Sequence, residues 1–334
     1  MGHSDSETTK NKLSRMVLDY GVLFLAITIF LFFILAESKV FHIENLLTIL
    51  RQASVLGLIS LALMITVIVG DFDISVTFNA NFACTIIVIL VLNNVNFPLA
   101  LLLGFLGSIL ISMINCTMVV FVGLPSFVAT IGMKFFLEGL CRGMTENKQL
   151  FPINPPPGYF FIGRYLVFDF IPVQVIIFIV ITLLLTIYFR VSKRARYIHA
   201  LGESIETASH VGIHVKRLRF FAYLLSGILL GLAGIIGSSM YGITASGMME
   251  GYLIPALTSA FLGASFIRHG KKPISNPPGT ALSAMILALL TNGFTMLGLP
   301  FYYKQTIEGC ILIGTMIMVT LLMKRHIQIK RQRL

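Results

Sequence analysis

Apolar runs long enough to cross a membrane recur along the whole chain, separated by short polar stretches. A helix needs about 20 mainly apolar residues to span a bilayer. The runs occupy residues 17–36, 45–92 with an interruption at 70–73, 99–122, 125–144, 170–189, 220–241, 252–266, 276–297 and 303–323. Because the second run is long enough to cross twice, the pattern predicts about ten membrane segments.

These runs predict an all-α fold, a polytopic transmembrane helical bundle that forms a single domain over residues 1–334. Broken or re-entrant helices are expected where polar residues or glycine interrupt a run. One such break is expected at Asn292-Gly293 in the ninth segment. Glycines at helical spacing, which predict a close approach of two helices, are Gly227, Gly231 and Gly234.

The distribution of charge predicts the orientation. Apolar residues make up 56% of the chain and charged residues 12%, and the net charge is +11. The basic residues gather at 10–15, 190–219, 268–272 and 324–334. Cytoplasmic loops of membrane proteins are rich in Lys and Arg, and ten crossings would put all four stretches on one side. We therefore expect the tails 1–16 and 324–334 and the loop 190–219 in the cytoplasm, and no nucleic-acid partner.

The sequence contains no recognised motif for nucleotide hydrolysis or for metal binding. Gly270-Lys271-Lys272-Pro273 has neither the upstream glycine nor the hydroxyl of a phosphate-binding loop, so the chain is not expected to hydrolyse nucleotide. The seven histidines are scattered, and the cysteines show no metal-ligand spacing. We expect a transport subunit that is not itself an enzyme and that holds no cofactor or metal. The cysteines, which all lie in apolar runs, are Cys84, Cys116, Cys141 and Cys310.

The sharpest polar feature interrupts the second apolar run at residues 70–76. Its polar residues alternate along the chain: Asp71, Asp73, Ser75, Thr77, Asn79 and Asn81. Each carboxylate would cost about 2.5–3.5 kcal/mol at the centre of a bilayer. Two interpretations stay open: a helix break that lines a polar path, or a short surface loop whose acids are solvated or cap the next helix.

A second feature is a predicted short amphipathic helix within residues 196–215. Its apolar face is formed by Ile198, Leu201, Ile205 and Ala208. Its polar face carries Glu203, Glu206 and His210, and Gly212 is a candidate C-cap. Such a helix either lies on the membrane surface or docks a partner.

Together these segments resemble the membrane permease subunit of bacterial ABC importers for monosaccharides, the ribose, xylose, arabinose and galactoside type. Residues 70–76 resemble the family's G-G-I-D-L-S-V, and residues 124–133 resemble its L-P-S-F-I-A-T-L-G-M. Residues 196–215 resemble its cytoplasmic loop, R-Y-x-x-A-x-G-x-N-x-x-A-A-x-x-S-G-I-x-V. Thr291-Asn292-Gly293 resembles its N-N-G.

The resemblance implies a multi-pass protein of the bacterial inner membrane. It implies a second permease subunit, identical or paralogous, a cytoplasmic ABC ATPase that holds ATP and Mg²⁺, and a periplasmic or lipid-anchored solute-binding protein. Residues implied for ATPase coupling are Gly202, Glu203, Glu206, Ala208 and Gly212. Residues implied for the substrate path are Asp71, Asp73, Ser75, Asn79, Phe127, Thr130 and Asn292.

Departures from the family pattern leave the solute open. Phe72 and Phe78 stand where the family has small or aliphatic residues, and residues 263–266 and 274–280 contain fewer glycines. A polyol, a nucleoside or an autoinducer signal is an alternative to a simple sugar. From the residues alone, an ion-coupled secondary transporter and a membrane enzyme with a metal on Asp71 and Asp73 also stay open.

Overall fold

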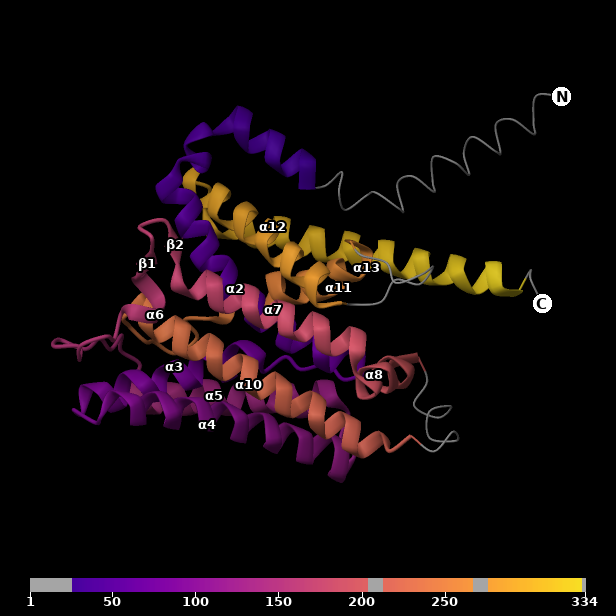
Figure 1. Ribbon diagram of the computed structural model, residues 1–334, viewed down its shortest axis with the longest axis horizontal. Helices are drawn as coiled ribbons and strands as arrows, with labels where there is room; N and C mark the ends of the chain where they lie inside the picture. Colours follow the sequence, from indigo (N-terminus) through magenta and orange to yellow (C-terminus); the bar gives the residue numbers. More distant parts are fainter. Residues whose placement is uncertain (1–25, 204–212, 267–275, 332–334) are drawn as a thin grey trace.

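The computed structural model describes residues 26–203, 213–266 and 276–331. Nearly all regular structure in these residues is helical (Figure 1). The first half contains a helix over Ala26–Ala36, η1 (Ser38–Phe41), α2 (Ile43–Ile68), α3 (Val76–Leu92), α4 (Phe97–Cys116), the π-helical η2 (Thr117–Val122) and α5 (Ser126–Thr145). The second half contains α6 (Phe161–Arg164), β1 (Leu166–Val167), β2 (Ile171–Pro172), α7 (Val173–Val191), α8 (Lys193–Glu203), α10 (Val215–Tyr241), η3 (Glu250–Tyr252), α11 (Leu253–Phe266), α12 (Pro277–Met296) and α13 (Phe301–Arg331).

Five of the described helices are long and apolar enough to cross a membrane. They are α2, α4 continued through η2, α7, α10 and α12. The prediction of an all-helical membrane bundle is therefore confirmed. The long helices run roughly along one direction, with the β1–β2 hairpin near one end of the bundle and α8 at the other (Figure 1).

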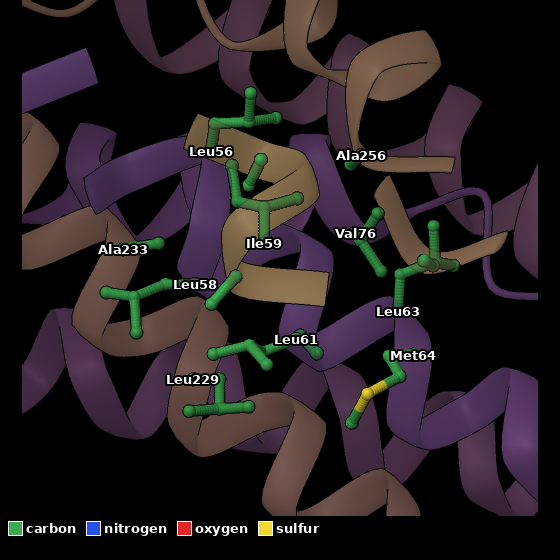
Figure 2. Close-up of a cluster of buried hydrophobic side chains, with 14 of the residues drawn as sticks. Leu56, Leu58, Ile59, Leu61, Leu63, Met64, Val76, Leu229, Ala233 and Ala256 are labelled. Carbon is green, nitrogen blue, oxygen red and sulfur yellow. The ribbon is translucent and has the colours of Figure 1, made fainter. Parts of the chain in front are cut away.

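Helix α2 forms the centre of the bundle. It packs against α10, α12, α11 and α7, and every residue from Ala53 to Thr66 is buried. Side chains of α2 such as Leu58 and Leu61 meet Leu229 and Ala233 of α10 (Figure 2). A helix that is apolar on nearly all faces lies either in a protein core or against lipid, and the neighbours of α2 place it in the core of the bundle.

Glycines bring α10 into close contact with its neighbours. A Cβ added at Gly227 would lie 2.9 Å from the Ser112 side chain of α4. At Gly234 it would lie 2.7 Å from the carbonyl oxygen of Ala80 in α3. The predicted close approach of two helices along this glycine stripe is confirmed, and three helices take part.

The break predicted at Asn292-Gly293 is wrong. Helix α12 continues through both residues to Met296. A Cβ at Gly293 would lie 2.4 Å from the ring of Phe33, so this glycine makes room for an aromatic side chain and does not interrupt the helix. Asn292 is satisfied without a break, because its Oδ1 accepts a hydrogen bond from Asn45 Nδ2 at 2.9 Å.

The segment between the apolar runs 125–144 and 170–189 and the predicted basic loop 190–219 both contain regular structure. The antiparallel strands β1 and β2 and the short helix α6 lie between α5 and α7. Helix α10 begins at Val215, five residues before the predicted start of that apolar run at Phe220. The extra turn places Arg219 inside a helix and against the core of the bundle.

Candidate functional site

The polar break between α2 and α3 begins with a glycine that ends α2. Gly70 has φ +86°, a left-handed conformation that costs glycine little. Its N–H donates to the carbonyl of Val67, and the N–H of Asp71 donates to the carbonyl of Thr66, both at 3.0 Å. These two bonds form a Schellman motif, which satisfies carbonyl groups that the last turn of a helix leaves free.

Asp73 organises the start of α3. Its Oδ1 accepts hydrogen bonds from the N–H of Ser75 at 2.9 Å and from Ser75 Oγ at 2.6 Å. Asn115 of α4 donates to Ser75 Oγ at 2.8 Å, which links the break to a third helix. Asp73 is fully buried, so the interpretation with solvated acids is wrong for this residue. Its bond to the N–H of Ser75 is an Asx-type turn that precedes the helix, whose N-cap position is Ser75.

Asp71 forms a buried ion pair with Arg219 of α10. Arg219 Nε donates to Asp71 Oδ2 at 2.9 Å, and its Nη2 donates to Asp71 Oδ1. The Asp71 side chain is 3% exposed and the Arg219 side chain 16%. The two-pronged geometry matches the planar guanidinium to the carboxylate. The pair joins the break to the helix that follows the basic segment 190–219.

The first turns of α5 hold the backbone of the break. Ser126 Oγ accepts from the N–H of Phe72 at 3.0 Å, and Thr130 Oγ1 accepts from the N–H of Ile74 at 3.1 Å. Thr130 Oγ1 also lies 3.0 Å from the carbonyl oxygen of Phe72. A buried backbone group without a partner is costly, and these hydroxyls provide the partners that a helix would otherwise supply.

Asn79 continues the polar network one turn into α3. Its Nδ2 donates to the carbonyl of Ser108 at 3.1 Å and to Ser112 Oγ at 3.0 Å, both in α4. Ser108 Oγ in turn donates to the carbonyl of Gly227 in α10 at 3.0 Å. Asn79 therefore joins three packed helices.

Four of the seven predicted path residues lie in the break or bond its backbone: Asp71, Asp73, Ser75 and Thr130. Asn79 lies one turn further on. Phe127 is 52% exposed on the first turn of α5. Asn292 lies elsewhere, because it bonds Asn45 at the start of α2 whereas the break follows the end of α2.

A row of charged residues on α5 is absent from the predicted functional residues. Lys134, Glu138 and Arg142 follow at four-residue spacing and share one face of the helix. Lys134 Nζ lies 2.8 Å from Glu250 Oε1, and Arg142 Nη2 lies 2.6 Å from Glu138 Oε1. The spacing was visible within the run 125–144, which was treated as uniformly apolar.

Open space surrounds the glycines of the same helix. A Cβ added at Gly132, Gly139 or Gly143 would meet no atom within 4 Å. Lys134 Nζ also lies 5.1 Å from the centre of the Phe78 ring of α3, which orders the charge against an aromatic face. Helix α5 thus carries ordered charges, and the surface at its glycines is not covered by other described residues.

The predicted amphipathic helix is present in its described part. Helix α8 starts at Lys193, three residues before the predicted start, and Ile198 and Leu201 are buried. A Cβ at Gly202 would lie 2.1 Å from the carbonyl oxygen of Ile68, so α8 rests against the last turn of α2. The Glu203 side chain and the residues Glu206, Ala208 and Gly212 lie outside the part that the structure describes.

The fold and the polar break together define a multi-pass helical membrane protein whose helix interruption is held by neighbouring helices. Residues 45–316 match the family described as branched-chain amino acid transport system / permease component, and the chain belongs to this family. No solved structure gives a significant match to the chain.

Curated relatives match over most of their length. The probable ABC transporter permease protein YphD of Escherichia coli K12 is 27% identical over 98% of this chain and 96% of its own. The ribose import permease protein RbsC of the same strain is 28% identical over 82% of this chain and 84% of its own. The autoinducer 2 import system permease protein LsrD of Photorhabdus temperata is 25% identical over 92% of each chain. The predicted resemblance to ABC importer permeases is confirmed, and an ion-coupled transporter is not favoured.

Proposed function

We propose that the chain forms half of the translocation path of an ATP-driven importer for a monosaccharide or a sugar-like solute. Relatives named for ribose and for autoinducer 2 support this substrate class. A sugar and an autoinducer signal are therefore both candidate solutes, and a polyol or a nucleoside is the alternative.

The charged face of α5 carries the proposal. At about 1.5 Å per residue, Lys134 lies about 12 Å along α5 from Ser126 and Glu138 about 18 Å. If α5 crosses the bilayer, both residues lie near its middle, where a charge facing hydrocarbon would cost at least about 2.5 kcal/mol. Lys134 and Glu138 are largely covered by their own chain, but their partners Glu250 and Arg142 are 50% and 59% exposed and require water or protein beside them. A second permease subunit that encloses an aqueous path against α5 meets this requirement.

Ten membrane segments fit the order of the helices. They are the helix Ala26–Ala36, α2, α3, α4, α5, α7, α10, α11, α12 and α13. Basic residues around α8 favour the cytoplasm for that end of the bundle, which would put both termini there too. The break and the Asp71–Arg219 pair would then lie near the cytoplasmic side of the path, in the inner membrane of a bacterium.

The partners follow from the proposed class. Helix α8 and the rest of the segment 190–219 would dock a cytoplasmic ABC ATPase, with Gly202, Glu203, Glu206, Ala208 and Gly212 as coupling residues. ATP and Mg²⁺ would be held by that ATPase, and this chain would hold no cofactor. An extracytoplasmic binding protein would deliver the solute to the opposite end.

Within this assembly we assign different tasks to the predicted path residues. The contacts of Asp71, Asp73, Ser75 and Thr130 support a role in holding the break, and those of Asn79 and Asn292 support helix packing. Phe127 is exposed and stays a candidate for the path. The charged face of α5 is the main candidate for contact with the solute or with the second subunit.

Cysteine labelling tests this assignment in membranes. Single cysteines at Phe127 and Phe135, which are 52% and 62% exposed on the side of α5 that carries the charges, should react with a membrane-impermeant maleimide added to opened vesicles in a Cys310→Ser background. A cysteine at Leu183 of α7, which is 56% exposed, should stay unlabelled because that helix faces lipid. If neither α5 position reacts and neither forms a cross-link to a second subunit, the proposed path along α5 is wrong.

A further inference from the structure

A basic cleft lies between α8 and the first turns of α10. It has a volume of about 490 Å³. Six of the residues that line it are Arg194, Tyr197, His214, Arg217, Leu218 and Phe221. The cleft thus combines two arginines and a histidine with apolar and aromatic walls, and none of the described residues that line it is acidic.

Among the residues that the structure describes, the two arginines have no acidic partner. None of the ion pairs among the described residues includes Arg194 or Arg217, whereas Arg219 of the same segment is neutralised by Asp71. Arg194 lies with its guanidinium carbon 4.9 Å from the centre of the Phe221 ring, which fixes its direction. Two positive charges, of which Arg194 is oriented by an aromatic ring, therefore line one cleft without a counter-charge from the described residues.

The position of the cleft favours an amphiphilic ligand. Helix α8 buries Ala195, Ile198 and Leu201 against the bundle, at the end where α7 finishes and α10 begins (Figure 1). The cleft therefore lies at the level where membrane helices leave the hydrocarbon. Basic pockets between such helices bind phosphate-bearing lipid headgroups, and arginine matches phosphate in two-pronged geometry.

We propose that this cleft binds the phosphate of an anionic phospholipid, with Arg194 and Arg217 on the phosphate and Leu218 and Phe221 beside the first part of the acyl chains. The bound lipid links α8 to α10. A docked ATPase acidic segment is disfavoured, because Phe221 and Leu218 give the cleft an apolar wall that suits a lipid chain better than a carboxylate. The inference goes beyond the proposed transport function and needs no ATPase for its test.

The test measures lipid binding to the purified full chain in neutral detergent. Native mass spectrometry would count bound phosphatidylglycerol and phosphatidylcholine during titration with each lipid. We expect phosphatidylglycerol to bind about tenfold more tightly than phosphatidylcholine. The double variant Arg194→Ala with Arg217→Ala should bind phosphatidylglycerol about tenfold more weakly than the unchanged chain does. The matched control is Lys193→Ala with Lys216→Ala, which removes the same charge from neighbouring exposed positions and should change the affinity less than about twofold.

Each alternative result overturns the proposal. An equal loss of phosphatidylglycerol affinity in both double variants would mean that the lipid responds to overall charge and not to the cleft. An unchanged affinity in the arginine variant would exclude the cleft as the binding site. Competition by millimolar inorganic phosphate would point to a free anion. If binding of the ATPase, and not of lipid, depended on the two arginines, the cleft would be a protein contact. Should the alanine variant fail to fold, Arg194→Lys with Arg217→Lys keeps the charge and should still lose several-fold, because lysine lacks the two-pronged contact.

Discussion

Replacing Asp71 by Asn removes one charge from the pair that joins the helix break to α10. The substitution keeps the size of the side chain but leaves Arg219, 16% exposed, without its counter-charge. Breaking a buried ion pair by removing one partner typically costs about 3–5 kcal/mol. We expect a loss near the lower end of that range, because Arg219 can reach water from its partly exposed side.

The free energy of unfolding can be measured in mild detergent by raising the fraction of SDS and following helical content by circular dichroism. The matched control is Glu138→Gln, which breaks a pair whose arginine is 59% exposed and should cost less than about 1 kcal/mol. The double variant Asp71→Asn with Arg219→Met should be more stable than the sum of the two single losses predicts. Losses that simply add, or an Asp71→Asn loss no larger than that of the control, would refute the inference that the pair holds the break.

Three further substitutions test single contacts. Thr130→Val leaves the N–H of Ile74 without its acceptor and should cost about 1–3 kcal/mol in the same unfolding assay, whereas a loss below about 0.5 kcal/mol would deny this hydroxyl a role in the break. Gly234→Val places a side chain 2.6 Å from Ala83 Cβ and should lower stability by about 1–3 kcal/mol. Gly139→Val meets open space and should not lower the stability of the isolated chain, because valine has a higher helix propensity than glycine. Gly202→Ala should displace α8 from Ile68, and it should lower ATP-dependent uptake even though the chain stays folded. Uptake at the level of the unchanged protein would contradict the close contact.

The long apolar runs, the break after Gly70 and the glycine stripe on α10 were the features best predicted by the sequence. Apolar length alone predicts helices such as α2, because a bilayer leaves few other folds. Gly70 predicts the end of α2, because few other residues adopt its left-handed conformation without strain. The glycine spacing on α10 predicts close packing, although it does not say which helices approach.

Contacts between distant residues could not be predicted in this way. Asp71 and Arg219 are 148 positions apart, and the basic composition around Arg219 is equally typical of a solvated cytoplasmic loop. Asn292-Gly293 looked like a break because glycine weakens an isolated helix, but the ring of Phe33 fills the space that the glycine leaves. The local sequence indicates only which conformation a segment prefers. In both of these cases, contacts with residues distant in the sequence determined the structure.

The charges on α5 show a different limit. Lys134, Glu138 and Arg142 were readable as a helical stripe, but hydropathy averaged over about 20 residues hides three charges among apolar neighbours. A count of charged residues at four-residue spacing would have found them. Their meaning depends on what lies beside α5 in the assembled transporter.

ATP-dependent uptake in proteoliposomes tests the central claim most directly. The chain would be reconstituted with its ATPase and binding protein, and uptake of labelled ribose and of related solutes would be followed with ATP on the ATPase side. The account predicts uptake that requires ATP, both partners and an intact α5, and that persists when the proton gradient is dissipated. Uptake by the chain alone, driven by a proton gradient and unaffected by ATP, would contradict it.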